Sequence, residues 1–135
     1  IWRDELIKPI LGDYEKVNKV IDIFTENPIV GMIGAKKHLY DKNYNIYQKS
    51  DMLKSYIQQF KLNVNLDEIQ YIGGTIFWVR FDIIKRFFTN NDPLKIIKSF
   101  EKNSFTDNNE LKWTHAFERV FGLMVANENK NIIGV

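Results

Sequence analysis

The sequence predicts an α/β domain in which a layered sheet is flanked by helices. A short apolar run with β-branched residues lies at 28–35, a second strand-like run lies at 69–80, and amphipathic segments of helical spacing separate and follow them. Strands that alternate with helices are typical of an α/β layered domain, and not of a bundle or a sandwich. No repeat, linker or low-complexity tract divides the chain, so we treat residues 1–135 as a single domain or a fragment of one.

The first part of the chain predicts two helices and a buried strand. A short helix is expected over 4–11, with Gly12 ending it and Asp13 placed to cap a second helix. Apolar residues recur at helical spacing in that second helix, which ends before Pro28. The run PIVGMIGA at 28–35 is typical of a strand that is buried on both faces.

The central part predicts a polar loop, a helix and a second strand. The loop covers 36–50, and Ser50 opens an amphipathic helix. The strand IQYIGGTIFWVR, at 69–80, is interrupted by Gly73 and Gly74. Paired glycines inside a strand pattern indicate a bulge or a close approach to the backbone, for example by a ligand.

The last part predicts three helices and a closing strand. Asp92 is placed to cap the second of these helices, with Pro93 at its first position. The expected ranges are 81–88 and 91–100 for the first two helices, 101–110 for a polar loop, Glu110 to about Asn127 for the last helix, and 131–135 for the strand.

Composition restricts the classes of function. The chain has no cysteine, which excludes disulfides and Cys-based metal centres and leads us to expect a cytoplasmic protein. Its 19 basic and 17 acidic residues are spread along the sequence, so no nucleic-acid partner is implied. No apolar run approaches the roughly 18 to 20 residues that cross a bilayer. The start lacks both a methionine and a signal-peptide pattern, and we expect the chain to be part of a longer protein.

The last helix contains the main candidates for chemistry. His115, Glu118 and Arg119 are three and four residues apart, which places them on neighbouring positions of one helix face. They form either a structural polar network or the polar wall of a substrate cleft. Glu110 is either a carboxylate favoured by the helix dipole or a general base. One histidine and one carboxylate fall short of a zinc site, so no metal is expected within this chain.

Five further residues have two interpretations each. Gly73 and Gly74 lack the context of a phosphate-binding loop but leave room for a ligand. Trp78 is a core aromatic or a surface on which a sugar stacks. Arg80 is a surface cation or the partner of a ligand carboxylate or phosphate. His38 is a solvated loop residue or a ligand contact beyond the carboxyl end of a strand.

Four motif-bearing segments follow one another along nearly the whole chain: WRDELIKPILG, FTENPIVGMIGAKKH, YIGGTIFWVRFDIIKRFF and HAFERVFG. Together they resemble the rhamnan synthesis protein F family of bacterial lipopolysaccharide, capsule and wall-polysaccharide synthesis. Glu110 falls where this family tends to carry an acidic residue. The family's motif positions correspond here to Trp2, Arg3, His38, Gly73, Phe77, Trp78, Arg80, His115, Glu118 and Arg119.

The resemblance implies a glycosyltransferase of the GT-A type. In such enzymes a nucleotide-binding half with an Asp-x-Asp metal motif precedes an acceptor-binding half, and this chain would correspond to the acceptor side. The sequence contains no Asp-x-Asp. We therefore expect the nucleotide sugar and a divalent metal, Mn²⁺ or Mg²⁺, to bind upstream in the rest of the parent polypeptide.

The resemblance leads to one hypothesis and one alternative. In the hypothesis, a cytoplasmic enzyme at the inner face of the inner membrane transfers a sugar, such as rhamnose, to a polysaccharide or lipopolysaccharide acceptor. Glu110, with Glu118 second, deprotonates the acceptor hydroxyl. Arg119, Arg80 and His115 position hydroxyls or offset diphosphate charge. The alternative is a non-catalytic carbohydrate-binding or assembly module, and in either case we expect the isolated fragment to be inactive.

Overall fold

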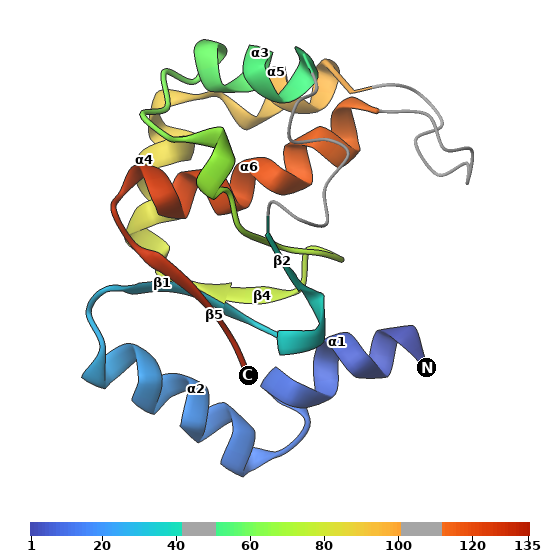
Figure 1. Cartoon of the computed structure of the whole chain (residues 1–135), viewed down its shortest axis with the longest axis vertical. Coiled ribbons are helices and arrows are strands. Elements are labelled where there is room, and N and C mark those ends of the chain that lie inside the picture. Colours follow the sequence, from blue (N-terminus) through green and yellow to red (C-terminus); the bar gives the residue numbers. More distant parts are fainter. Residues whose placement is uncertain (42–50, 101–111) are drawn as a thin grey trace.

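The computed structural model describes residues 1–41, 51–100 and 112–135, and in these ranges it has a mixed α/β fold. Two small sheets lie in the middle of the molecule, with helices α1 and α2 on one side and α3 to α6 on the other (Figure 1). The helices are α1 Trp2–Leu11, α2 Tyr14–Glu26, α3 Asp51–Gln59, α4 Phe81–Asn90, α5 Pro93–Lys98 and α6 Trp113–Asn127; the strands are β1 Val30–Gly34, β2 Leu39–Tyr40, β3 Tyr71–Ile72, β4 Phe77–Val79 and β5 Asn131–Gly134.

The central sheet has the strand order β4-β1-β5, with β1 antiparallel to β4 and parallel to β5. Ile33 of β1 is opposite both Trp78 and Ile133, and the three side chains share the face that α1 and α2 cover. Met32 is opposite Val79, and both belong to the other face. Because side chains alternate along a strand, the apolar β1 run supplies both faces with core residues.

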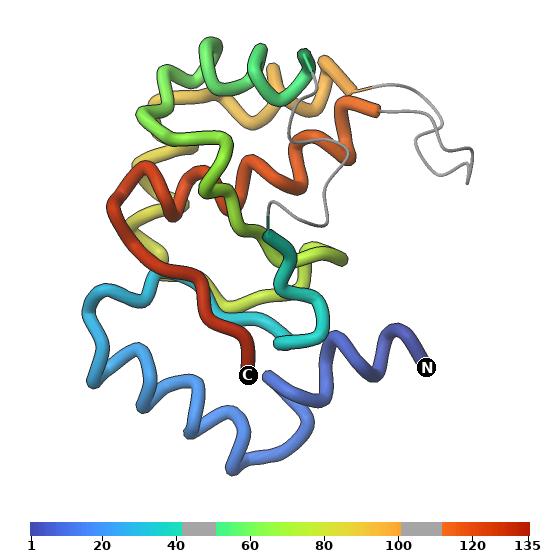
Figure 2. Tube along the Cα trace, viewed as in Figure 1, coloured from blue at the N-terminus to red at the C-terminus, as the bar shows by residue number. Residues whose placement is uncertain are grey.

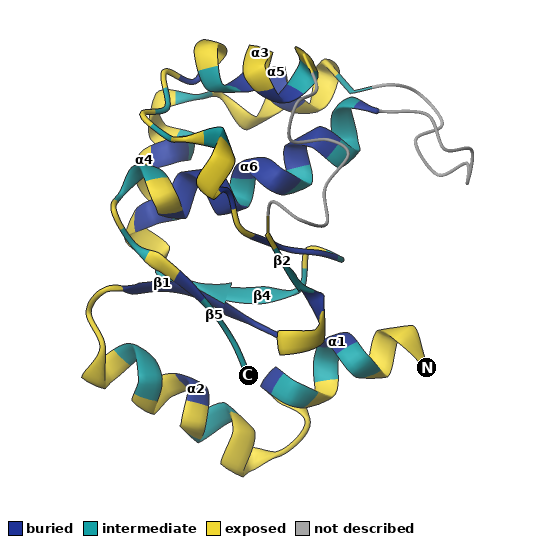
Figure 3. Cartoon of the chain, viewed as in Figure 1, coloured by how far each residue is buried: buried dark blue, intermediate teal, exposed yellow. Residues whose placement is uncertain are grey.

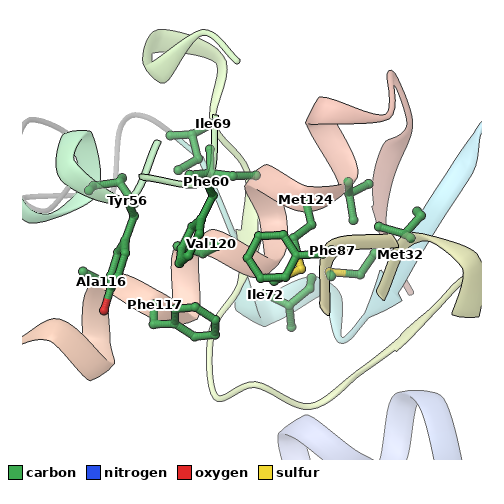
Figure 4. Packing of buried hydrophobic residues seen from close by; sticks show 14 of the residues in the cluster. Met32, Tyr56, Phe60, Ile69, Ile72, Phe87, Ala116, Phe117, Val120 and Met124 are labelled. Atoms are coloured by element: carbon green, nitrogen blue, oxygen red, sulfur yellow. The ribbon is translucent and has the colours of Figure 1, made fainter. Parts of the chain in front are cut away.

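The larger core lies between the sheets and helices α3 to α6. Its centre is Phe117 of α6, whose ring lies 5.6 Å from the ring of Tyr56 and 5.4 Å from that of Phe121, centroid to centroid. Figure 4 shows side chains from α3, α4 and β3 gathered around α6. Most of α6 is buried, whereas α2 exposes its outer face to solvent (Figure 3).

Several expectations from the sequence are confirmed. The α/β class is correct, and the predicted strands at 28–35 and 131–135 correspond to β1 and β5. Asp13 caps α2 by accepting the Lys16 N–H at 2.9 Å. Asp92 caps α5 by accepting the Leu94 N–H, also at 2.9 Å. These caps satisfy N–H groups that have no acceptor within the helix.

The predicted single strand at 69–80 is wrong, because the chain turns in its middle. Gly74 has φ +82° and Thr75 has φ 55°, a left-handed conformation that breaks the extended run. The first half becomes β3, which pairs with β2 in a separate sheet, and the second half becomes β4 of the central sheet. The tube trace of Figure 2 follows this change of direction.

Two boundaries also differ from the prediction. The last helix begins at Trp113 and not at Glu110, since Lys112 has the extended conformation of an N-cap residue. The expected loop at 36–50 contains strand β2 at its beginning, and its later part lies outside the described residues. Glu110 and the expected loop at 101–110 also lie outside them. No helix in the described part of the chain combines the length and apolar character that a membrane span requires.

Candidate functional site

The carboxylate of Glu118 joins α6 to the turn between β3 and β4. Its Oε1 accepts the Gly74 N–H at 2.6 Å and the Thr75 hydroxyl at 3.3 Å. Its Oε2 accepts a hydrogen bond from Arg119 at 2.8 Å. Hydrogen bonds to an ionised acceptor are stronger than those between neutral groups, so the turn is held firmly against the helix.

Arg119 is the buried cation of this site, with 8% of its surface exposed. One guanidinium nitrogen donates to Glu118 and to the carbonyl of His115, and the other donates to the Tyr71 hydroxyl at 3.0 Å. The guanidinium carbon also lies 4.5 Å from the centre of the Tyr71 ring. Burial raises the pKa of the Tyr71 hydroxyl, so it stays protonated near neutral pH.

The paired glycines allow two neighbouring segments to approach this turn. The Gly73 N–H donates to the carbonyl of His38 at 2.9 Å, and a side chain at Gly73 would overlap with the ring of Tyr40. A Cβ at Gly74 would lie 3.2 Å from the indole of Trp2. The expected close approach to the glycines therefore occurs, and within the described residues the approaching groups belong to the protein itself.

His38 lies behind the glycine turn and is only 5% exposed, so the solvated-loop interpretation is wrong. Its Nδ1 is 3.4 Å from the Tyr40 hydroxyl, and its Nε2 is 3.8 Å from a carboxylate oxygen of Glu5. The indole of Trp2 meets the imidazole edge-on, with 6.4 Å between ring centres. Trp2 itself is 60% exposed, so the aromatic contacts extend from the interior to the surface.

We call this arrangement the glycine-turn cluster. It combines an exposed indole, a buried imidazole, a strained turn and a partly buried ion pair within one connected set of contacts. Its members are Trp2, His38, Gly73, Gly74, Glu118 and Arg119.

Two predicted site residues lie away from the glycine-turn cluster. Arg80 donates to the carbonyls of Val30 and Phe24, each at 2.6 Å, and its guanidinium lies over the Phe24 ring. Trp78 donates its indole N–H to the carbonyl of Ile10 at 3.2 Å and packs in the core beneath α1 and α2. These contacts give both residues a structural role that joins the sheet to the two N-terminal helices.

His115 is partly buried on α6, one turn before Glu118, and its backbone carbonyl accepts a hydrogen bond from Arg119. The other proposed catalytic carboxylate, Glu110, lies outside the described residues. Within the described ranges, no three His, Asp or Glu side chains gather closely enough to hold a metal ion.

Reasoning from the sequence missed three residues that contact the glycine-turn cluster. Tyr71, Thr75 and Tyr40 all contact the glycine-turn cluster, and each comes from β2, β3 or the turn that follows β3. The hydrophobic pattern carried no signal for the pairing of β2 with β3, because each strand has only two residues.

No family model and no solved structure matches the chain. Two curated relatives do, both from Xanthomonas campestris pv. campestris and both named "Uncharacterized protein WxcX". The protein of strain B100 is 23% identical over 136 residues, and that of a second strain is 22% identical over the same length. Each alignment covers 99% of this chain, and the chain spans 18% of the length of each relative.

Proposed function

We propose that the chain forms the acceptor-side part of a bacterial glycosyltransferase, which transfers a sugar such as rhamnose from a nucleotide sugar to a cell-surface polysaccharide or lipopolysaccharide. The observation that supports this most is the convergence of four distant segments. Each segment that resembles the rhamnan synthesis protein F family contributes to the glycine-turn cluster, with Trp2, His38, the paired glycines, and Glu118 with Arg119 in turn. Trp2 extends this set of mostly buried residues to the surface, which gives a ligand access to it.

The chemistry of the glycine-turn cluster suits a saccharide hydroxyl. The exposed indole of Trp2 offers an apolar face on one side of the glycine turn. The carboxylate of Glu118, which binds the Gly74 N–H of the same turn, offers directed hydrogen bonds. An ionised carboxylate has about four acceptor positions, and protein donors take three of those of Glu118. The remaining position is on Oε2, to which a hydroxyl of the acceptor saccharide would donate a hydrogen bond.

In this proposal Glu118 orients the acceptor hydroxyl, and Glu110 takes its proton. A carboxylate fixed by three donors keeps its geometry during the reaction, which is the property an orienting group needs. Arg119 holds Glu118 in place and balances its charge. His115 is close enough in sequence to contribute a further contact on the same helix face.

The nucleotide sugar and its divalent metal would bind elsewhere in a longer protein. Within the described residues, no three His, Asp or Glu side chains lie close enough together to hold a metal ion. The matched relatives are much longer than this chain, which spans 18% of their length. We place the complete enzyme in the cytoplasm, at the inner face of the inner membrane, as its polysaccharide acceptor would require.

The second candidate is a non-catalytic carbohydrate-binding or assembly module. It is favoured by one observation, namely that both oxygens of Glu118 already hold protein donors. Such a module would keep the exposed Trp2 and the ion pair for binding, without transferring a sugar.

The proposal is tested by sugar transfer in the longer protein that carries this segment. Glu118→Gln retains an oxygen for the Gly74 N–H but loses the ionised Oε2, and we expect turnover to fall about 100-fold through misorientation of the acceptor. Glu26→Gln, an exposed carboxylate at the end of α2, is the matched control and should leave turnover unchanged. Equal turnover in both variants would refute the orienting role. Saccharide binding without any transfer would favour the module.

A further inference from the structure

A polar groove lies at the opposite end of α6 from the glycine-turn cluster. It is a cavity of about 610 Å³ where the C-terminal ends of α3, α4 and α6 meet. In Figure 1 this end of α6 lies beside α4, on the far side of the molecule from the N-terminus of α1. We call it the amide groove; its polar wall includes Gln59, Arg86, Asn90, Asn91, Asn127 and Glu128.

Two amides of the groove are fixed in a known orientation. Asn91 donates its Nδ2 to the carbonyl of Phe87 at 3.0 Å, so its Oδ1 is the atom left for a ligand. Asn127 accepts the Asn63 N–H on its Oδ1 at 2.7 Å, so its Nδ2 is left as a donor. The partner atoms are a carbonyl and an N–H, which determine the direction of each amide. The groove thus offers an oriented acceptor and an oriented donor.

Arg86 adds a fixed pair of donors without excess charge. Its Nε and Nη2 bind both oxygens of Glu128, at 2.8 and 3.1 Å, and Nη2 also binds Asp82 at 2.9 Å. Among the described residues, Nη1 has no hydrogen-bond partner, so its two N–H groups remain for a ligand. Two carboxylates balance the charges of Arg86 and of Lys61, which also lines the groove.

The floor and the charge of the amide groove argue against a nucleotide ligand. Phe60 and Phe87 are only 8% and 7% exposed, so neither presents an open ring face on which a nucleobase could stack. The balanced charge around Arg86 also gives no excess positive charge for a phosphate. Oriented donors and acceptors above an apolar floor instead suit a neutral molecule that carries many hydroxyl groups.

The length of the groove indicates more than one sugar ring. A second hollow of about 520 Å³ shares Gln59, Phe60, Asn90 and Asn91 with the first and continues toward the start of α5. Gln59 and Asn90, at the junction, make no side-chain hydrogen bond to the rest of the described chain and are both exposed. We propose that the amide groove binds a neutral oligosaccharide, at a site separate from the glycine-turn cluster and independent of its proposed function.

The test is a residue-resolved NMR titration of the ¹⁵N-labelled chain. The probes are two neutral trisaccharides, an α-linked L-rhamnose trisaccharide and maltotriose, with uridine monophosphate as the charged comparison. We expect at least one trisaccharide to shift the side-chain amide signals of Gln59, Asn90, Asn91 and Asn127, and uridine monophosphate to shift none of them. No shift with either trisaccharide, or a shift with uridine monophosphate, would overturn the proposal.

A matched pair of variants identifies the groups that bind. The double variant Gln59→Ala with Asn90→Ala removes two exposed amides that hold nothing in the fold, and we expect it to raise the Kd about tenfold. Gln58→Ala, its exposed neighbour outside the groove, should leave the Kd unchanged. An unchanged Kd in the double variant would contradict the assignment. The signals of Gly74 and Trp2 report on the glycine-turn cluster. A failure of the proposed function is therefore distinguishable from a failure of the amide-groove proposal.

Discussion

Replacing Gly122 by alanine gives a stability test in which two physical effects have opposite signs. Gly122 lies inside α6, the longest helix of the described chain, where alanine is favoured over glycine by about 1 kcal/mol on helix propensity alone. A Cβ at this position, however, would overlap with the carbonyl oxygen of Gln70 and lie 3.0 Å from Tyr71 Cβ. Because the oxygen belongs to the backbone, the helix and the start of β3 would have to separate.

We expect the overlap to exceed the propensity gain. Overfilling a packed contact costs about 1 to 3 kcal/mol, and a clash with a backbone oxygen belongs to the upper part of that range, about 2 to 3 kcal/mol. After the propensity gain of about 1 kcal/mol is subtracted, Gly122→Ala should lower the free energy of unfolding by about 1 to 2 kcal/mol. Urea unfolding followed by circular dichroism measures this change, with Ser55→Ala on the exposed face of α3 as the control that should not destabilise. A Gly122→Ala variant as stable as the wild type, or more stable, would refute the packing of α6 on β3.

Three further predictions concern single residues. Asp92→Ala should lower the free energy of unfolding by about 1 kcal/mol, because the Leu94 N–H loses its cap; thermal unfolding without a decrease would contradict this. Gly74→Ala should cost about 1 to 2 kcal/mol, since φ +82° strains any residue with a Cβ; urea unfolding measures it, and an unchanged midpoint would show that the turn tolerates a side chain. Burial raises the pKa of the Tyr71 hydroxyl in the folded state. The stability that the protonated hydroxyl contributes is therefore fully present below the ordinary tyrosine pKa of about 10, and it is lost as the pH rises through the raised pKa. When the pH is raised from neutral to about 11, the free energy of unfolding should therefore decrease less in Tyr71→Phe than in the wild type. Urea unfolding at each pH measures the two decreases, and equal decreases would exclude this linkage.

Local signals in the sequence predicted the helices and strands β1 and β5 well. Asp13 and Asp92 act as caps because each bonds an N–H two or three residues ahead, a contact that needs no tertiary structure. The apolar run of β1 correctly indicated a strand covered on both faces. Helix propensity and hydrophobic periodicity are sufficient to predict an element when the residues that stabilise it are near in sequence.

Long-range contacts explain most of what the sequence did not predict. The turn at Gly74 is held by Glu118, which lies 44 positions later, so a bulge and a chain reversal could not be distinguished from the glycines alone. Arg80 was a candidate for ligand binding, yet its donors go to backbone carbonyls 50 and 56 positions earlier. Backbone acceptors carry no signature of residue type, so sequence reasoning had no means of finding them.

The candidate site was predicted in part. The spacing of His115, Glu118 and Arg119 on one helix face left open a polar network or the wall of a cleft. The structure contains a network of Glu118 and Arg119, with Tyr71 as a further member. The meeting of His38 with the glycine turn depends on the pairing of β2 with β3. That pairing joins two short strands from distant parts of the chain, which periodicity does not detect.

Saccharide binding at the glycine-turn cluster is the central claim, and a titration with methyl α-L-rhamnopyranoside tests it most directly. We predict that the indole N–H signal of Trp2 and the amide signal of Gly74 shift together and saturate. In Trp2→Ala the amide signal of Gly74 should no longer shift. In Tyr14→Ala, which removes another exposed aromatic residue, it should still shift. Signals of Trp2 and Gly74 that stay unchanged at saturating sugar concentrations would contradict the claim.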